Sequence, residues 1–286
     1  MDSMIVKKNA PTNLKEALKP KLTKKEFEFA PKAFDSFGDI AVIEIPKELE
    51  KKKKIIGEAL LSISPRFVTV CSIESNHEGE FRVQKVKVIA GKKNLIATYR
   101  ESAVTLKIPL GEVFFSPRLG SERLRIAQEI KKGEFIGCWF SGVGPYPIVI
   151  AKNSQMLGAI AIELNPVAHK FAKENAVINK CSDKIEFVKG DVKKVYKKYK
   201  NKFDRIAMPL PHTGYQFLKE AFYCIKPKGV IYFYEIVEKE DYATPLKQIK
   251  GAATAQKRKI KVVRKKRVRQ FSPTKEQVVF DIKVLN

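Results

Sequence analysis

The chain has 286 residues, which is long enough for two domains, and its hydrophobic content of 44% is typical of a folded protein. Lys and Arg number 56 against 31 Asp and Glu, and the resulting net charge of +25 favours a polyanionic partner such as nucleic acid. No apolar run reaches the about 18 residues of a membrane span, and no signal-peptide core is present. The four cysteines and three histidines lack zinc-ligand spacing, so we expect a cytoplasmic protein without a bound metal.

The first third of the chain predicts a short arm followed by a small domain. Prolines interrupt residues 1–36, so we expect at most a short helix at 12–18 in an otherwise extended arm. Residues 37–117 then alternate apolar runs with turn residues, which predicts a small α+β domain. Its expected helix is amphipathic and covers 48–63, and its expected strands lie near 37–46, 66–75, 79–91, 94–102 and 104–115.

A second domain is expected over residues 118–286, where the period of the apolar residues changes. The run SERLRIAQEIKKG predicts a helix capped by Ser121 and ended by Gly133. Strands and helices then alternate to about residue 237, which is the signature of an α/β fold with a doubly wound parallel sheet. Two further strands are predicted at the end of the chain, the first of them an edge strand with a basic outer face.

A glycine-containing turn follows the first strand of this second domain, in the sequence Phe140-Ser-Gly-Val-Gly-Pro-Tyr146. Gly142 and Gly144 permit a tight turn and a close approach of backbone amides to a ligand, although glycine in such turns also has purely conformational reasons. Pro147 stands where a dinucleotide-binding fingerprint has its third glycine, which argues against NAD.

Acidic residues end the next two predicted strands. Glu163 is placed to accept hydrogen bonds from ribose hydroxyls, or alternatively to cap the helix that begins at Asn165-Pro166. Asp191 follows Gly190 and can receive the amine of an adenine, or serve only in a turn. Cys224 lies in an apolar helical run and is interpreted as a core residue.

Glycines, Glu and Asp at the ends of three successive strands resemble the layout of class I (Rossmann-like) methyltransferases, whose cofactor is S-adenosylmethionine (SAM). The resemblance implies SAM as cofactor of this chain. The contacts that it implies come from Arg123, Phe140, Gly142, Gly144, Glu163, Leu164, Asp191, Val192 and Pro209.

A more specific resemblance rests on three motifs: Phe114-Phe-Ser-Pro-Arg-Leu-Gly-Ser-Glu-Arg123, the glycine turn, and Met208-Pro-Leu-Pro211. Together they are similar to the archaeal and eukaryotic tRNA (guanine-N1)-methyltransferase family, which modifies guanosine 37 beside the anticodon. The resemblance covers about residues 37–286 and implies the anticodon stem-loop of tRNA as partner and a monomeric enzyme. Because only a short segment precedes residue 37, we expect the family's elbow-binding domain to be missing.

Matched to the family motif by motif, Glu122 falls on the glutamate that accepts the N1 proton of guanine. Arg82, expected in a strand, falls on the arginine that steadies O6 as negative charge builds, and Arg123 on the residue that reaches the methionine carboxylate of SAM. From the residues alone, Glu122 and Arg123 could equally be a solvated first helical turn, and Arg82 could hold a phosphate or a surface carboxylate.

Two departures from the family pattern bear on specificity. Pro209 replaces the usual Asn before Leu-Pro, and Cys138 replaces the usual Asp of the first strand. The Pro-Tyr-Pro run after the glycines resembles an archaeal branch in which some members also methylate C7 of the tricyclic wyosine precursor, and this motivates a dual-activity hypothesis. Two alternatives stay open: transfer of the aminocarboxypropyl group of SAM to tRNA, and a non-catalytic RNA-binding relative.

Clusters of basic residues are expected to supply the tRNA footprint. They lie at Lys51–Lys54, Lys193–Lys202 and Lys257–Arg269. Charge-rich surfaces also occur in proteins from hot habitats, but that adaptation enriches both signs, whereas the excess here is one-sided. The excess predicts a steep loss of RNA affinity with salt.

Overall fold

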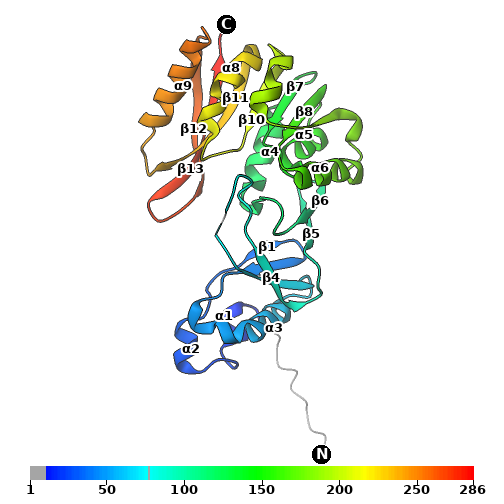
Figure 1. The fold of residues 1–286 in the computed structure, drawn as a ribbon, viewed down its shortest axis with the longest axis vertical. Coiled ribbons are helices and arrows are strands. Elements are labelled where there is room, and N and C mark those ends of the chain that lie inside the picture. Colours follow the sequence, from blue (N-terminus) through cyan, green and yellow to red (C-terminus); the bar gives the residue numbers. More distant parts are fainter. Residues whose placement is uncertain (1–10, 77) are drawn as a thin grey trace, which may run out of the picture. The chain divides into compact units, whose positions relative to one another are not determined.

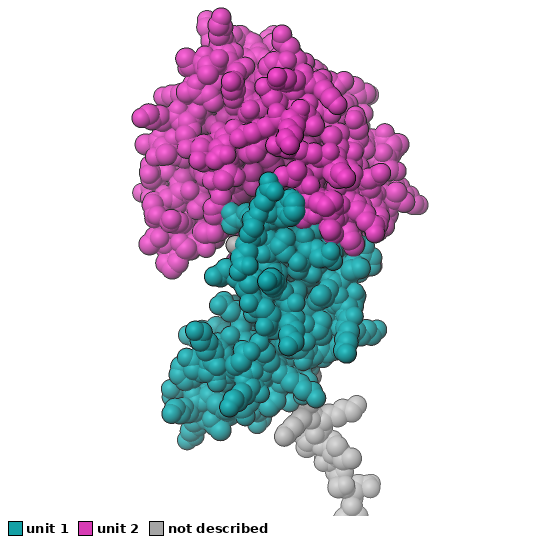
Figure 2. Space-filling model, in the orientation of Figure 1, with its two compact units in different colours: residues 1–99, 107–114 teal, residues 100–106, 115–286 magenta. Residues whose placement is uncertain are grey.

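The computed structural model describes residues 11–76 and 78–286, which form two compact units (Figures 1 and 2). Unit 1 contains Met1–Tyr99 and Lys107–Phe114, and unit 2 contains Arg100–Leu106 and Phe115–Asn286. The division passes through a two-stranded hairpin, β5 (Ile96–Glu101) and β6 (Val104–Pro109).

Unit 1 is built on a four-stranded sheet of order β1-β2-β3-β4. The parallel pair β2-β3 is connected through the 3-10 turn η1 and helix α3, whose stripe of Ile56, Ala59 and Leu60 is fully buried. This stripe arises because apolar residues three or four apart share one face of a helix. The bounds are β1 (Asp35–Phe37), β2 (Ile40–Ile43), η1 (Lys47–Lys52), α3 (Lys53–Ile63), β3 (Thr69–Ile73) and β4 (Val86–Gly91).

The segment expected to be an extended arm is instead part of unit 1, as far as it is described; residues 1–10 lie outside the described residues. The short helix expected at 12–18 is α1 (Leu14–Leu18), and a second helix that was not expected, α2 (Lys24–Glu28), follows it. Asn13 caps α1, and Thr23 and Glu26 form a capping box on α2, so side chains satisfy the first free amides of both short helices. The leucines of α1 pack into the same core as α3. Prolines limit the length of these helices but do not exclude them from the core.

Unit 2 contains a seven-stranded sheet of order β12-β13-β11-β10-β7-β8-β9. Strands β7 to β11 are parallel, which confirms the predicted doubly wound α/β fold, and β13 runs antiparallel to both β11 and β12. The strands are β7 (Phe135–Trp139), β8 (Gly158–Glu163), β9 (Ile185–Lys189), β10 (Phe203–Met208), β11 (Ile225–Glu238), β12 (Ile260–Gln270) and β13 (Lys275–Val284). The α-helices are α4 (Gly120–Glu129), α5 (Pro145–Asn153), α6 (Pro166–Ile178), α7 (Val192–Val195), α8 (Leu218–Cys224) and α9 (Ala243–Ala255). The 3-10 turns are η2 (Pro117–Leu119), η3 (Ser182–Lys184), η4 (Tyr196–Tyr199) and η5 (Gly214–Phe217).

Alternate residues of β11 contact different helices of unit 2. Ile231 and Phe233 join the core that includes Cys224 of α8 and Ile249 of α9. Tyr234, on the opposite face, donates a hydrogen bond to the carboxylate of Glu122 in α4. The two-residue period of a strand therefore separates an apolar face from the face that carries the polar site.

Helix α4 begins differently from the expectation. Its N-cap is Leu119, which makes no side-chain cap, and Ser121 lies inside the first turn. The preceding 3-10 turn runs directly into the helix, and its Pro117 carbonyl accepts the amide of Gly120. The helix also ends at Glu129 rather than at Gly133. The 3-10 turn that begins at Pro117 thus takes the place of a side-chain cap. Such turns are common at the starts of α-helices.

We expect Leu18→Ala to lower the free energy of unfolding of unit 1 by about 2–5 kcal/mol, because it leaves a cavity at a fully buried position. Lys15→Ala, at an exposed position on the same helix, should stay within about 0.5 kcal/mol of the wild type. Urea unfolding followed by circular dichroism measures both. Equal stability of the two variants would show that α1 is dispensable to the core.

Candidate active site

The glycine turn between β7 and α5 has the conformation that the sequence predicts. Phe140, Gly142 and Gly144 all have positive φ angles, of 54°, 55° and 86°. A Cβ at Gly144 would lie 3.0 Å from Cδ1 of Ile148 and 3.3 Å from Cβ of Ala172, so only glycine fits without a shift. The turn therefore brings backbone close to the carboxyl edge of the sheet, where ligands of open α/β folds bind.

Glu163 ties the glycine turn to the end of β8. Its Oε2 accepts the amide of Gly142 at 2.7 Å, and its Oε1 accepts the amide of Asn165 at 2.7 Å. Burial raises the pKa of Glu163, and the backbone donors oppose that rise. The cap of α6 is Asn165 itself, whose Oδ1 accepts from the second and third residues of the helix. The alternative in which Glu163 caps this helix is therefore wrong.

The remaining residues expected to contact the cofactor differ in exposure. Leu164 follows Glu163 and is 39% exposed, so its apolar side chain is available to a flat ring. Val192 is buried in the core of unit 2. Asp191 caps α7 by accepting the amide of Lys193 at 2.8 Å. This contact agrees with the alternative in which Asp191 serves in a turn. Phe140 packs edge-on against Phe217 with 4.8 Å between ring centroids.

Glu122 is nearly buried, at 3% exposed, and lies in the first turn of α4. Its Oε1 accepts from Nη2 of Arg125 at 2.6 Å and from the hydroxyl of Tyr234 at 2.8 Å. Its Oε2 accepts from Nε of Arg125 at 2.8 Å and, in the described part of the chain, from nothing else. A solvated first turn is therefore the wrong interpretation, and Oε2 keeps one acceptor direction for a ligand.

The guanidinium of Arg123 is bound by other groups of the protein. Its Nε and Nη2 donate to both carboxylate oxygens of Glu101, at 2.5 and 2.6 Å, and its guanidinium lies over the ring of Phe115. The side chain is 1% exposed and also approaches the carbonyl of Ser116. The structure thus does not support the expectation that Arg123 holds a cofactor carboxylate, because its charge is already neutralised by a buried partner.

Arg125, which the motif analysis missed, links the site to the other end of the chain. Besides its two bonds to Glu122, it donates from Nη1 to Asp281 of β13 at 2.9 Å and to Glu129 at 2.9 Å. Its pKa is raised even though burial alone would lower it, because Glu122 and Asp281 favour the charged form. The spacing of Glu122 and Arg125 suggests a helical ion pair, but no local pattern reveals Asp281.

The Met208–Pro211 turn at the end of β10 is held by backbone bonds. Its Leu210 amide donates to the Met208 carbonyl at 2.8 Å, and the Pro211 carbonyl accepts the amide of Ile236 at 3.0 Å. Pro209 is partly exposed at this edge. Cys138, the other departure from the family pattern, is buried in β7, where burial raises its pKa, so it is a packing residue.

Arg82 belongs to unit 1 and lies in a turn rather than in the predicted strand. Its φ is 52°, its amide donates to the carbonyl of Gly79 at 3.1 Å, and β4 begins only at Val86. Burial lowers the pKa of Arg82. The apolar alternation of residues 79–91 predicts a strand correctly in its second half, but the Glu78–Val83 bridge closes a tight turn in the first half.

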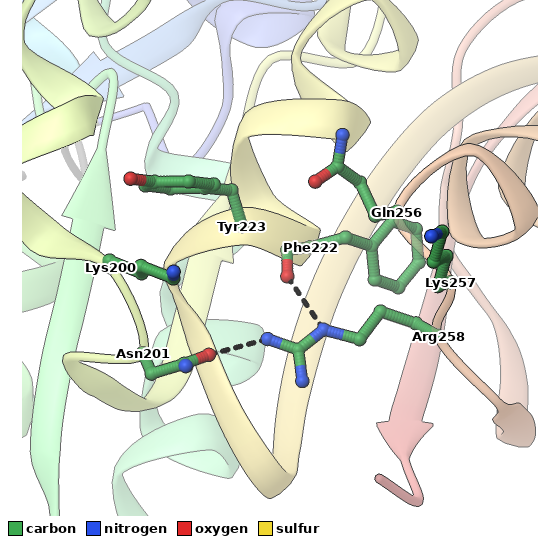
Figure 3. Close-up of a pocket in the computed structure, with 7 residues that line it drawn as sticks. All are labelled: Lys200, Asn201, Phe222, Tyr223, Gln256, Lys257 and Arg258. Carbon is green, nitrogen blue, oxygen red and sulfur yellow. Dashed lines mark hydrogen bonds between the residues drawn. The ribbon is translucent and has the colours of Figure 1, made fainter.

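A small pocket of about 210 Å³ lies at the opposite, amino edge of β10 and β11 (Figure 3). Arg258 crosses it and donates to the carbonyls of Phe222 and Ile225, each at 3.0 Å, and to the side chain of Asn201. These bonds join α8 to the start of β12, so the arginine is structural and the pocket is separate from the glycine turn. Its lining comprises Lys200, Asn201, Phe222, Tyr223, Gln256, Lys257 and Arg258.

Residues 11–76 and 78–286 contain no group of three His, Cys, Asp or Glu side chains arranged to hold a metal ion. None of the helices in these residues has the length and apolar character needed to cross a bilayer.

The doubly wound sheet, the glycine turn and the acidic ends of β8 and β9 define a class I methyltransferase fold. A family model described as the TRM5/TYW2 methyltransferase domain matches residues 97–263, and one described as the TYW2 N-terminal domain matches residues 14–94. The chain therefore belongs to the TRM5/TYW2 family of SAM-dependent methyltransferases. The second match begins at α1, in agreement with the packing of that helix in unit 1.

Individual relatives are similar over most of the chain. The tRNA (guanine(37)-N(1))-methyltransferase Trm5b of Pyrococcus abyssi is 34% identical, over 90% of this chain and 76% of that protein. The tRNA 4-demethylwyosine(37)-methyltransferase Taw21 of Saccharolobus solfataricus is 29% identical, over 88% of this chain and 94% of that protein. A solved structure described as the complex of aTrm5 and tRNALeu has a TM-score of 0.85 and 28% identity, over 100% of this chain and 82% of that one.

The carboxyl edge of β11 also carries a carboxylate whose titration should be visible. Burial raises the pKa of Glu235 from 4.5 to about 7. Because folding disfavours the ionised form, stability is greatest below pH 4.5 and falls as the pH rises to about 7. We expect Glu235→Gln to remove this decline in urea unfolding between pH 4.5 and 8. The exposed Glu238→Gln serves as control, and a decline that persists in Glu235→Gln would assign it to another group.

Proposed function

We propose that this chain is a SAM-dependent tRNA methyltransferase that transfers a methyl group to N1 of the guanine at position 37. The observation that carries the proposal is the placement of Glu122 beside the first turn of α5. Tyr146 of that turn has its ring 6.3 Å from the ring of Tyr234, which is hydrogen-bonded to Glu122. A carboxylate with a free acceptor direction thus lies next to the turn that holds SAM in this fold.

The residues around the glycine turn fit SAM as a cofactor. The carboxylate of Glu163 accepts backbone amides and retains capacity to accept a ribose hydroxyl, because its two oxygens together offer about four acceptor sites. Leu164 offers an exposed apolar surface to adenine. The hydroxyl of Ser141 is buried, has no partner among the described residues and is available to a polar group of the ligand. Gly142 and Gly144 leave room for a close backbone approach, and Phe140, Asp191, Val192 and Pro209 remain proposed neighbours.

In this proposal Glu122 acts as the general base. SAM, when bound, supplies an electrophilic methyl carbon attached to a positively charged sulfur. Oε2 of Glu122 would take the N1 proton of guanine, which would free the N1 electron pair to accept the methyl group that SAM would supply, with the sulfur as leaving group. Arg125 and Tyr234 fix both carboxylate oxygens, so the base is oriented before the substrate arrives.

Charge and relatives support tRNA as the substrate. The chain carries a net charge of +25, and the similar aTrm5 structure is described as a complex with tRNALeu. Arg82 remains the proposed group that steadies guanine O6; its pKa is lowered by burial, so the cation is partly desolvated and interacts more strongly with a developing negative charge. A monomer is proposed as the working form.

The proposal is tested with labelled SAM and tRNA transcripts that carry G or A at position 37. We expect label only in the G transcript, recovered as 1-methylguanosine after digestion. Label recovered as an aminocarboxypropyl adduct would show that the chain transfers the aminocarboxypropyl group of SAM rather than its methyl group. SAM binding and tRNA binding without any transfer would leave a non-catalytic relative.

The tricyclic wyosine precursor is a second candidate substrate, because Pro209 leaves no side-chain amide to select guanine at the end of β10. The similarity to Taw21 of Saccharolobus solfataricus supports the same candidate. A tRNA that carries this base at position 37 belongs in the same assay. Methyl transfer to guanosine 37 but not to the tricyclic base would exclude the second activity.

Glu122→Gln should reduce single-turnover methyl transfer by at least about 100-fold, because an amide cannot accept the N1 proton. Asp281→Asn is the matched control: it also removes an acidic partner of Arg125 but leaves the base in place. We expect this control to retain transfer within about tenfold of the wild type, with SAM affinity unchanged in both variants by calorimetry. Equal losses in the two variants would assign Glu122 to the structure of the site rather than to proton transfer.

A further inference from the structure

Strand β12 is one of the two edge strands of the large sheet and is unusually basic. Six of its eleven residues are Lys or Arg, and none is acidic. It pairs only with β13 in the order of the sheet, so its outer edge faces away from the other strands. An edge strand rich in Lys resists pairing with other sheets, but that purpose does not require the cations to lie on one face.

Two β-bulges gather four cations on a single face of β12. The register shifts between Val262 and Arg264 and again between Arg267 and Arg269. Each shift adds one residue and therefore reverses the alternation of faces that follows. As a result, Lys261, Arg264, Lys266 and Arg269 lie opposite the alternate β13 residues 283, 281, 279 and 277, and so share one face. We call these four residues the cationic row.

The cationic row lies on the same face of the sheet as α4. Arg264 contacts Asp281 at 3.2 Å, and Asp281 also binds Arg125 of α4. On the other face, Lys265 packs over the ring of Tyr242 at 4.0 Å. These contacts agree with the register and place the row on the side of the sheet that carries Glu122.

Part of the charge of the row is not neutralised. Arg264 is paired with Glu129 and Asp281, but Lys261 and Lys266 are exposed and form no ion pair with a residue that the structure describes. Lys261 lies directly opposite Lys283, a like-charge pair that costs stability. Burial, followed by the nearby cations Arg205 and Lys131, lowers the pKa of Lys283. A polyanion would relieve this repulsion.

The other end of the row reaches the carboxyl edge of the sheet. Arg269 donates to the side chain of Gln277 at 2.8 Å, and Gln277 is in register with Ile236 of β11. The amide of Ile236 donates to the Pro211 carbonyl of the turn at the end of β10. Register and hydrogen bonds therefore connect the row to the turn beside the proposed target base.

An exposed aromatic pair lies where the end of β12 meets the turn after β10. Phe271 is 41% exposed and packs edge-on against His212, with 5.5 Å between ring centroids, and Arg269 lies over its ring at 5.7 Å. His212 is also exposed and follows Pro211 directly. An exposed aromatic ring next to a line of cations is the arrangement that binds single-stranded nucleic acid, because bases stack while phosphates pair.

We propose that the cationic row and Phe271 form a track for the tRNA anticodon loop, in which Lys261 and Lys266 bind backbone phosphates and Phe271 stacks on a base next to the target nucleotide. This inference rests on the proposed function, since it assumes tRNA as the substrate. RNA fits better than a lipid surface or an acidic protein, because the row leads along one strand to an aromatic ring at the candidate active site.

The phosphate part of the track is tested with the double variant Lys261→Gln/Lys266→Gln. The matched control is Lys247→Gln/Lys250→Gln, which removes the same charge from exposed positions on α9, over the opposite face of the sheet. Binding of a tRNA transcript is measured by fluorescence anisotropy at several salt concentrations. We expect the slope of log affinity against log salt to decrease by about 1 for each lysine in the row variant and to change little in the control.

The stacking part is tested with Phe271→Ala and Phe271→Leu. 2-Aminopurine placed at nucleotide 36 or 38 should be quenched by the wild-type protein and not by either variant. We expect about tenfold weaker binding of the tRNA, with unchanged SAM affinity. The leucine variant preserves apolar packing against His212, so quenching that survives in Phe271→Leu would overturn the stacking role.

The outcomes separate this inference from the proposed function. Equal affinity and equal salt slope of the row variant and the α9 control would overturn the track while methyl transfer persists. A wild-type chain that binds tRNA through the row but transfers no methyl group would refute the proposed function and support the track. If the row variant lost binding to heparin or to anionic vesicles by the same factor as binding to tRNA, the row would bind polyanions in general, and the proposal would be overturned.

Discussion

The pairing of Arg125 with Glu122 and Asp281 is the interaction on which the candidate active site depends. It joins the first turn of α4 to β13, two segments separated by 156 residues in the chain. The three groups are largely removed from water, so loss of the shared Arg125 would leave the buried carboxylates of Glu122 and Asp281 uncompensated, at a cost of about 3–5 kcal/mol. The same geometry leaves one acceptor direction on Oε2 of Glu122, so the pairing that stabilises the fold also orients the proposed base.

The sheet brings the other parts of the site together by a simpler constraint. Parallel strands end at one edge, and the glycine turn, Glu163, Asp191 and the Met208–Pro211 turn all lie at the carboxyl ends of such strands. Glu163 reinforces this edge by accepting amides from two successive loops. β12 contributes to the same edge although it is an added strand, because it runs parallel to β11 through its antiparallel partner β13. The edge thereby combines a proposed cofactor site with a proposed RNA surface.

Much of the fold could be predicted from local patterns. The alternation of strands and helices after residue 120 identified the α/β sheet, and both C-terminal strands and the core role of Cys224 were expected and are observed. The short helix expected at 12–18 is observed as α1, but the sequence analysis missed α2, because prolines suggested an extended chain where the Thr23–Glu26 capping box points to a helix. Arg82 was misplaced because a tight turn interrupts an alternating run.

The sequence by itself determined the class of fold, the glycine turn, the acidic strand ends and the family motifs, because each depends on neighbouring residues and their periodicity. Only the tertiary structure decided that Glu101 neutralises Arg123, that Arg125 holds Glu122, and that two bulges place four cations on one face of β12. These features depend on which distant segments pair and in what register. A shift of one residue exchanges the faces of a strand, and no local pattern reports it.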